Sequence, residues 1–175
     1  MKARIYLRAS TKEQDSNRAE SALLEFASNK NLKVLEIYCE NYSGTKLERP
    51  ELNRLLQDSQ QGEILLVESV DRLSRLSQED FDTLKLRLSE KKLKLVVMDL
   101  PTTYEHFSEG ITGSIMTVIN NMLIDLMATM ARLDQEKRVE RIKQGMEKAK
   151  AQGRRVGGRA KNQELRDNIK KYSDR

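Results

Sequence analysis

The sequence predicts an α/β fold, in which a parallel sheet of about four strands with flanking helices is followed by a long protruding amphipathic helix. Two patterns indicate this fold. Up to residue 110, short apolar runs alternate with helical segments of about a dozen residues, which implies right-handed βαβ connections and a parallel sheet. From Gly113 onward the apolar residues recur at a period near 3.6, as on one face of an α-helix. The 175 residues, 38% of them hydrophobic, suffice for one domain and an appendage.

The first elements follow from local pattern. Residues 2–7 alternate polar and apolar side chains and are rich in strand formers, so we expect a first strand there. The polar segment 8–17 contains neither Gly nor Pro, which favours a structured loop over a tight turn. Apolar residues at helical spacing predict a helix over 19–30, and the segment 34–38 is typical of a second strand. A long polar loop is expected over 40–50.

The later elements continue the alternation. Pro50 suits the first turn of a helix, which we expect over 51–61. The continuous apolar run 64–67 predicts a central strand that is buried on both faces. A third helix is expected over 78–90 and a fourth strand over 93–98. Because functional residues of parallel sheets gather at the carboxyl ends of the strands, the residues that follow these strands are candidates for chemistry.

The long helix carries an apolar stripe. We define this stripe as Ile115, Val118, Ile119, Met122, Leu123, Leu126, Met130 and Leu133. The helix continues with charged residues through Ala151, and Gly153 is expected to end it. A helix of roughly 35–40 residues spans about 55 Å, which is longer than the body of a small domain, so it should leave the domain. The stripe then needs a partner, most simply the same helix of a second subunit. The alternative is a helix folded back on its own sheet.

Charge is distributed unevenly along the chain. The net charge is +5, yet residues 141–175 hold twelve Lys and Arg against four Asp and Glu. Such a basic segment is expected of a protein that binds a polyanion such as DNA. A solvated, frayed terminus would have the same composition.

Composition excludes several classes of function. With one cysteine, Cys39, and one histidine, His106, the chain can form neither an internal disulfide nor a zinc site of the usual His/Cys kind. Carboxylate-held magnesium stays open on composition alone. The start of the chain has no apolar stretch long enough for a signal peptide, and no run approaches the length of a membrane span. We therefore expect a cytoplasmic protein without a membrane partner.

A serine and several arginines follow the expected strands. Ser10 and Arg8 fall on the same side of an extended chain after the first strand. The other candidates are Asp71, Arg72 and Arg75 after the third strand, and Arg49 before the second helix. Guanidinium groups in bidentate contact suit a phosphate and the added charge of a pentacoordinate transition state. A serine among arginines, without a nearby histidine, is unlike an acyl-transfer triad and predicts phosphoryl transfer without a metal.

Each of these residues has a simpler interpretation when taken alone. Ser10 could cap the following helix. Asp71 and Arg72 could form a surface ion pair, and Arg49 could be an ordinary loop residue. Their joint placement at strand ends favours the functional interpretation.

Four separated motifs together point to a known family. They are Tyr6-Leu7-Arg8-Ala9-Ser10-Thr11 with Gln14, then Ser43-Gly44, then Glu48-Arg49-Pro50-Glu51-Leu52, and finally Val70-Asp71-Arg72-Leu73-Ser74-Arg75. In this order they resemble the resolvase/invertase family of small serine recombinases, and their residue sequences are most similar to those of plasmid-borne resolvases. The resemblance covers roughly residues 3–159.

The resemblance implies a role for each candidate. Ser10 would be the nucleophile that attacks the scissile phosphodiester, leaving a 5′-phosphoserine link and a free 3′-hydroxyl. The supporting residues would be Arg8, Arg72 and Arg75 on the phosphate, Arg49 as a further active-site arginine, and Asp71 and Gln14 as polar supports. The resemblance implies no cofactor, neither metal nor nucleotide, because the phosphoserine conserves the bond energy for religation. It implies no small-molecule substrate either.

The resemblance also implies the partners. These are double-stranded DNA and further copies of the chain, which would form a homodimer through the long helix and then a synaptic tetramer with subunit rotation. The residues expected to contact DNA are Arg141, Lys143, Lys150, Arg154, Arg155 and Arg159. The expected location is the bacterial cytoplasm, on nucleoid or plasmid DNA.

Two features depart from the family pattern. Asp134-Gln135-Glu136-Lys137 stands where many relatives have an arginine, which leaves DNA contacts there uncertain. Only Ala160–Arg175 follows the basic linker 153–159, and no recognition helix of a helix-turn-helix domain fits there. The expected organisation is therefore a catalytic domain over 1–110, a dimerisation and DNA-contacting helix over 111–152, and over 153–175 a basic linker with the start of a truncated or missing helix-turn-helix domain.

Two other functions compete with this hypothesis. A signalling receiver domain shares the parallel sheet, but it needs a phosphate-accepting Asp at a strand end, where this chain has Arg8 and Ser10. A nucleic-acid-binding or dimerisation module without catalysis is opposed by the intact set of arginines. The group that takes the proton from Ser10 stays open between Asp71 and an arginine that acts electrostatically. The target site, and the choice among resolution, inversion and transposition, also stay open.

Overall fold

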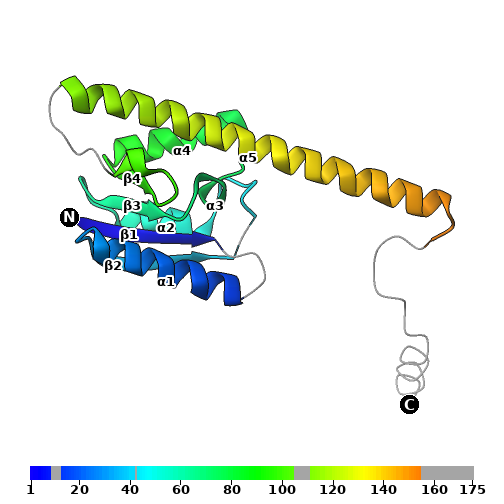
Figure 1. The fold of residues 1–175 in the computed structure, drawn as a ribbon, viewed down its shortest axis with the longest axis horizontal. Coiled ribbons are helices and arrows are strands. Elements are labelled where there is room, and N and C mark those ends of the chain that lie inside the picture. Colours follow the sequence, from blue (N-terminus) through cyan, green and yellow to red (C-terminus); the bar gives the residue numbers. More distant parts are fainter. Residues whose placement is uncertain (9–12, 42, 105–110, 155–175) are drawn as a thin grey trace, which may run out of the picture. The chain divides into compact units, whose positions relative to one another are not determined.

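The computed structural model, which describes residues 1–8, 13–41, 43–104 and 111–154, contains a four-stranded sheet (Figure 1). Its strands are β1 (Lys2–Arg8), β2 (Lys33–Glu40), β3 (Ile64–Val67) and β4 (Lys94–Val97). They lie in the order β2-β1-β3-β4, and every neighbouring pair is parallel. This confirms the predicted parallel sheet and places the first and third strands side by side.

The helices follow the predicted alternation, with four differences. They are α1 (Glu13–Asn29), α2 (Pro50–Asp58), α3 (Val70–Leu73), α4 (Gln78–Glu90), the 3₁₀ turn η1 (Pro101–Thr103) and α5 (Ile111–Ala151). The expected loop over 8–17 was wrong for its second half, because α1 already begins at Glu13. Residues 13–17 are all polar, so they carry no apolar period that could indicate a helix. α3 was not predicted, since four residues are too few to show a period. α2 ends at Asp58, three residues before its expected end, and η1 was not predicted.

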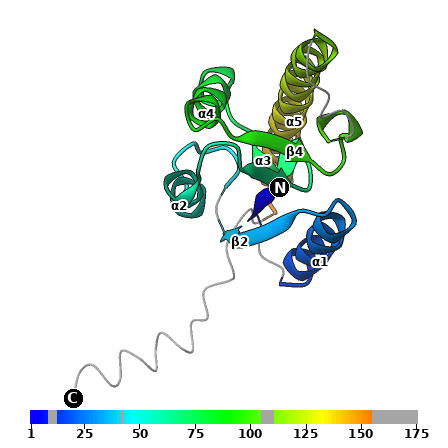
Figure 2. The same cartoon turned by 90° about the vertical axis from the view of Figure 1, so that its left-hand side faces the viewer.

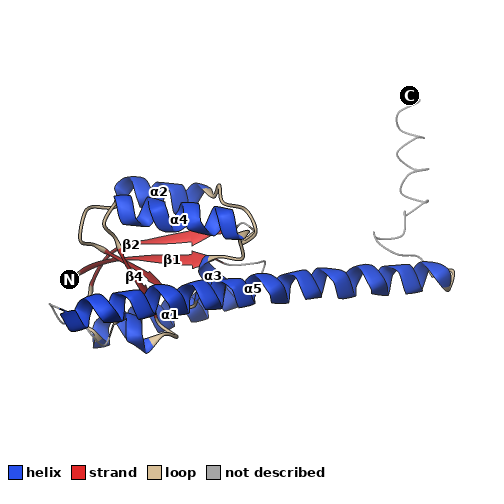
Figure 3. Ribbon diagram, turned by 90° about the horizontal axis from the view of Figure 1, so that it is seen from above, coloured by secondary structure: helices blue, strands red, loops and turns tan. Residues whose placement is uncertain are grey.

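Helices cover both faces of the sheet. Ala3, Ile5 and Leu7 of β1 pack with α1 in one apolar cluster. Tyr6, which points the opposite way because strand side chains alternate, packs in a second cluster with apolar residues of α2 and α4. Figures 2 and 3 show α1 across the sheet from α2 and α4. The same alternation places Arg4 and Arg8 on the α2 face.

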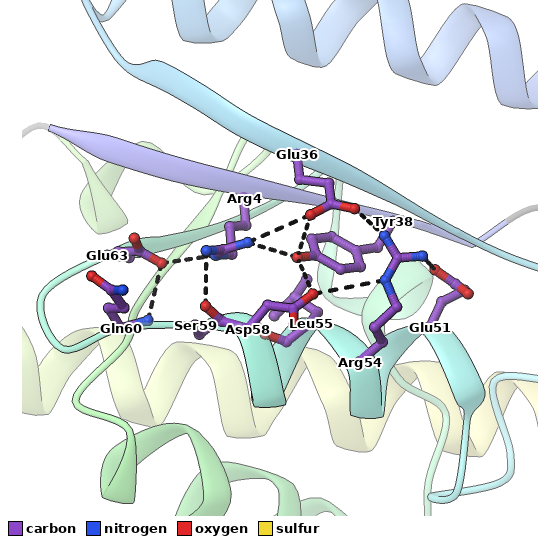
Figure 4. Close-up of polar contacts among 10 residues, drawn as sticks. All are labelled: Arg4, Glu36, Tyr38, Glu51, Arg54, Leu55, Asp58, Ser59, Gln60 and Glu63. Carbon is purple, nitrogen blue, oxygen red and sulfur yellow. Dashed lines mark hydrogen bonds and ion pairs between the residues drawn. The ribbon is translucent and has the colours of Figure 1, made fainter.

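A polar network surrounds Arg4 near the amino end of β1 (Figure 4). Its guanidinium donates to Glu63 Oε2 at 2.8 Å, to the Tyr38 hydroxyl at 2.6 Å and to the Asp58 carbonyl at 2.8 Å. The Tyr38 hydroxyl also lies 3.0 Å from Asp58 Oδ2 and 3.1 Å from Glu36 Oε2. Arg4, Tyr38 and Glu63 are buried, so this network joins β1, β2, α2 and the start of β3 inside the domain.

The long helix α5 has 41 residues, which corresponds to about 60 Å at 1.5 Å per residue. Ile124 and Ala128 are buried in the cluster that contains α2 and α4, so α5 does pack against its own domain. The apolar stripe is a different face of the helix. Its members except Leu123 are exposed, for example Met122 at 63% and Leu126 at 55%. The helix therefore has an inner apolar contact, as in the alternative of a helix folded back on its own sheet, and an exposed outer apolar stripe.

Hydropathy alone would allow α5 to cross a membrane. Within Gly113–Ala151 an 18-residue window reaches a mean hydropathy of 1.3, so the expectation that no run approaches a membrane span was wrong by this measure. One such helix is weak evidence for a membrane segment. Part of its apolar surface packs on the domain through Ile124 and Ala128, and Asp125 of the same helix forms an ion pair with Lys85 at 2.6 Å.

The chain divides into two compact units, Met1–Glu136 and Lys137–Arg175. The first holds the sheet, its helices and the part of α5 that bears the apolar stripe. In the second, α5 ends as predicted: Gly153 has φ of +68°, and the amide of Arg154 donates to the carbonyl of Ala149 at 2.8 Å.

Candidate active site

Arg8 is the last residue of β1 and is buried at the carboxyl edge of the sheet. Its Nε donates to the carbonyl of Arg72 at 2.9 Å, and its Nη2 donates to the carbonyl of Asp71 at 3.2 Å. Because β1 lies beside β3, the chain that continues from β3 into α3 passes directly against the end of β1. These contacts confirm the prediction that the ends of β1 and β3 lie side by side.

Gly44 lies against the Arg8 guanidinium. A Cβ at this position would stand 3.0 Å from both Cζ and Nε of Arg8. The Arg8 side chain has little room to yield, since it is bonded to the carbonyls of Asp71 and Arg72. The Gly44 carbonyl in turn accepts from the amide of Arg75 at 2.9 Å. A side chain at position 44 would thus displace Arg8 or separate the loop from α3.

Arg49 is completely buried and fastens the same loop. Its guanidinium donates to the carbonyls of Lys46 at 2.7 Å and Gly44 at 3.1 Å, to the Tyr6 hydroxyl at 3.3 Å, and to the carbonyl of Leu73. These acceptors are all neutral, and none of the ion pairs found among the described residues includes Arg49. Arg49 therefore joins the loop to the end of α3, beside Tyr6.

Asp71 of α3 and Arg75, which follows α3, form an ion pair across four positions of the sequence. Asp71 Oδ2 accepts from Arg75 Nη2 at 3.1 Å, and Asp71 Oδ1 accepts from the Ser69 hydroxyl at 2.6 Å. Burial alone would raise the pKa of Asp71, but the hydrogen bonds from Ser69 and Arg75 and the charges of Arg75 and Arg72 outweigh it and hold the pKa below its ordinary value. Arg75 Nη1 also donates to Gln135 Oε1 of α5 at 3.3 Å.

Arg72 is the arginine of α3, and it forms an ion pair with Glu68. Arg72 Nε lies 3.5 Å from Glu68 Oε2, while Glu68 Oε1 accepts from Arg18 Nη2 of α1 at 3.0 Å. Glu68 directly follows β3, so its carboxylate lies at the same edge of the sheet as the arginines. The i,i+4 spacing of Glu68 and Arg72 is a signal from which the pair could have been predicted.

The arginines influence each other electrostatically. Burial, followed by the charges of Arg75 and Arg49, lowers the pKa of Arg8 below its ordinary value. Guanidinium groups repel one another unless negative charge lies among them. Here the carboxylates of Asp71 and Glu68 supply part of the compensating negative charge. An arrangement of this kind favours binding of a further anion such as a phosphate.

The predicted site residues are thus partly assembled in the described structure. Arg8, Arg49, Asp71, Arg72 and Arg75 come together at one sheet edge, as predicted. Ser10 lies outside the described residues, two positions after Arg8 in the sequence. The side chain of Gln14 lies outside them too. Sequence reasoning did not assign a role to Glu68, Ser69 or Gln135; for Gln135, 60 positions from Arg75, no local pattern could have done so.

The residues expected to contact DNA belong to the second unit. Arg141, Lys143, Lys150 and Arg154 are exposed there. Arg141 Nε donates to the carbonyl of Lys137 at 3.3 Å, within the helix. Arg155 and Arg159 lie outside the described residues.

An arginine cluster, in which Arg8 and Arg49 are buried, lies at the end of β1 on a four-stranded parallel sheet that a long helix follows. Residues 3–155 match the family described as "Resolvase, N terminal domain". The chain therefore belongs to the resolvase family of serine recombinases, which are DNA strand-exchange enzymes. This identification sets aside the receiver-domain alternative.

Individual relatives agree with the family. A resolvase from Escherichia coli is 40% identical over 157 residues, which cover 89% of this chain and 71% of the relative. A DNA-invertase of Escherichia phage P1 is 32% identical over 165 residues, which cover 91% of this chain and 76% of the invertase. Among solved structures, the N-terminal catalytic domain of TP901-1 integrase is similar with a TM-score of 0.50 at 27% identity, over 72% of this chain and 98% of that domain.

Proposed function

We propose that this chain is a site-specific recombinase of the resolvase type that cleaves and rejoins DNA through a covalent 5′-phosphoserine at Ser10. The observation that carries the proposal is the meeting of Arg8, Arg72 and Arg75 at the carboxyl end of β1. Ser10 follows this strand by two residues in the sequence. The domain organisation that we propose is the expected one, 1–110, 111–152 and 153–175.

The proposed reaction is a transesterification. Ser10 Oγ forms a bond to the scissile phosphorus and gives up its proton, the bond from phosphorus to the 3′-oxygen breaks, and the departing 3′-oxygen takes up a proton. In religation a 3′-hydroxyl attacks the phosphoserine and restores Ser10. The number of phosphodiester-type bonds is unchanged in each step, so no nucleotide needs to be consumed. Guanidinium groups can stabilise the charge that develops on the phosphorane oxygens, so we propose that no metal is required.

The residues of the cluster have different tasks in this proposal. Arg8, Arg72 and Arg75 bind the phosphate. Arg49, whose donors are directed at carbonyls and at Tyr6, holds the loop against the end of α3, the helix that carries Arg72. A carboxyl whose pKa lies below its ordinary value is a poor base, so Asp71 serves better to hold Arg75 than to accept the Ser10 proton. Gln14 remains a proposed polar support.

We further propose that the apolar stripe pairs two copies of α5 and that two such dimers form the synaptic tetramer. A row of exposed Met, Leu, Ile and Val side chains on one helix face is costly in water and is removed most simply by a second copy. Met side chains in the stripe adapt to more than one packing arrangement, which a subunit rotation requires.

DNA would be bound by the second unit. The proposed contacts are those of Arg141, Lys143, Lys150, Arg154, Arg155 and Arg159 with phosphates, the last three along the minor groove. The proposed location is the bacterial cytoplasm, on nucleoid or plasmid DNA. Removing residues 153–175 should lower the slope of log binding constant against log salt concentration by about 0.9 for each phosphate that the shortened chain no longer neutralises.

Covalent capture tests the proposed chemistry. The chain is incubated in EDTA with a library of supercoiled plasmids that carry random inserts, and DNA that stays on the protein in SDS is recovered and sequenced. The recovered inserts then serve as the substrate. Wild-type chain should give a 5′-linked adduct, and Ser10→Ala should give none. An adduct that survives Ser10→Ala, or a strict requirement for magnesium, would refute the mechanism. A wild-type chain that binds DNA but never forms an adduct would indicate a module without catalysis.

A further inference from the structure

Gln135 of α5 contacts the arginine cluster from outside the motifs that define it. Its Oε1 accepts from Arg75 Nη1 at 3.3 Å, while Arg75 Nη2 donates to Asp71 Oδ2 at 3.1 Å. Both terminal nitrogens of one guanidinium are thus held, one by α3 and the other by α5. Within the part of the chain that the structure describes, no hydrogen bond of the Arg75 Nε–H is found.

Holding Arg75 in this way has a physical consequence. An arginine side chain loses considerable rotamer entropy when it is fixed, and a cation that is already oriented avoids that loss at the moment a phosphate binds. The Arg75 side chain is 26% exposed, so water alone would leave it several alternative rotamers. The pair of contacts with Asp71 and Gln135 selects one of them.

The position of Gln135 depends on how α5 sits on the domain. Within the first unit α5 is anchored by the buried side chains of Ile124 and Ala128 and by the ion pair of Asp125 with Lys85. Gln135 lies two residues after Leu133, the last member of the apolar stripe. A shift or rotation of α5 that accompanies pairing of the stripe would therefore change the distance from Gln135 to Arg75.

We infer that Gln135 is a positioning residue, which orients the Arg75 guanidinium for the scissile phosphate and makes cleavage depend on the placement of α5. This inference rests on the proposed function. It assigns to α5 a second task beside subunit pairing, namely to hold one of the arginines of the active site in its working orientation.

The first test needs no DNA. The order of the Arg75 Nε–H group is measured by ¹⁵N relaxation in the full chain for wild type, Gln135→Ala, Gln135→Glu and Gln144→Ala. Gln144 is an exposed residue of the same helix whose side chain donates to Glu140 at 3.2 Å, so it controls for the loss of a glutamine. Gln135→Ala should make Arg75 mobile, Gln135→Glu should keep it ordered because an acceptor oxygen is retained, and Gln144→Ala should match wild type. Equal order in all four chains would overturn the inference.

The second test separates binding from cleavage on the plasmids recovered by covalent capture. Gln135→Ala should slow adduct formation by about fivefold to tenfold, which corresponds to the net contribution of one ordinary hydrogen bond, while the Kd for DNA changes less than about twofold. Gln135→Glu should regain at least half of the lost rate. A Gln135→Ala chain that cleaves at the wild-type rate, or that loses cleavage and binding equally, would overturn the inference and leave the proposed function standing. A wild-type chain that forms no adduct would overturn both.

Discussion

Asp71 Oδ2 accepts a hydrogen bond from Arg75 Nη2 at 3.1 Å, and this pair links the segment after β3 to the charge that we assign to phosphate binding. Asp71 also accepts from the Ser69 hydroxyl. The two hydrogen bonds together fix the orientation of the Asp71 carboxylate and favour its charged form. The Asp71 side chain is 42% exposed, which means that its removal should disturb the site far more than the stability of the domain.

We therefore expect Asp71→Asn to lower the rate of covalent adduct formation by about tenfold or more, because Arg75 loses a charged partner. Thermal unfolding should change little. Asp82→Asn is the matched control, since Asp82 is an exposed aspartate of α4 in an ion pair with Lys85 at 3.0 Å. A normal cleavage rate in Asp71→Asn would show that the pair is dispensable for the chemistry.

We expect Glu68 to compete with the scissile phosphate for Arg72. The Glu68 carboxylate lies 3.5 Å from Arg72 Nε. A scissile phosphate that binds Arg72 must therefore displace this carboxylate or share the Arg72 guanidinium with it. Glu68→Gln should therefore raise the affinity for DNA or the cleavage rate by up to about fivefold, the upper range for an ion pair near the surface. Glu79→Gln, at an exposed site on α4, should have no effect on either quantity. Slower cleavage in Glu68→Gln would mean that Glu68 holds Arg72 in its productive orientation instead.

The apolar stripe can be tested by sedimentation equilibrium. Leu126→Glu introduces a charge at a side chain that is 55% exposed, so the monomer should fold normally while the dimerisation constant falls by about tenfold or more. Leu86→Glu provides the control, because Leu86 is 59% exposed on α4 and does not belong to the stripe. Equal self-association of the two variants would place the subunit interface elsewhere.

Tyr38 gives the domain a dependence on alkaline pH. Burial and the hydrogen bonds to Asp58 and Glu36 raise the pKa of Tyr38 from 10.0 to about 12. A group with a raised pKa contributes stability that is fully present below pH 10 and is lost as pH rises toward 12, since only the unfolded chain ionises in that window. The free energy of unfolding should therefore fall more steeply with pH in wild type than in Tyr38→Phe. Chemical denaturation at about pH 8, 10 and 11 measures this difference, and parallel curves would contradict the assignment.

Sequence pattern predicted some elements fully and others only in part, for physical reasons. The bounds of β3 were predicted because a short run of four consecutive apolar residues is buried on both faces when it forms a central strand of a sheet. The bounds of α4 were predicted as well, and its start is fixed by Ser77, which accepts from the amide of Asp80. α3 could not be predicted, because its carbonyls are held by Arg8 and Arg49 from elsewhere in the chain.

The same distinction applies to the site. That Arg8 and Arg72 meet follows from the order of strands in a parallel sheet, so it could be inferred before the structure was known. The burial of Arg49 could not be inferred, since arginine is among the residues least often buried completely. The contact of Gln135 with Arg75 depends on where the long helix crosses the domain, which no periodicity specifies.

The buried Arg49 has a consequence for thermodynamic linkage. A cation removed from water and bonded only to neutral acceptors raises the free energy of the folded domain. An anion that enters the arginine cluster lowers that free energy, and the unfolded chain cannot benefit to the same extent. If the cluster binds a DNA phosphate as proposed, binding and folding are coupled, and we expect duplex DNA to stabilise the catalytic domain itself. Such a recombinase would be least stable when free and would gain stability on engaging the strands that it cuts.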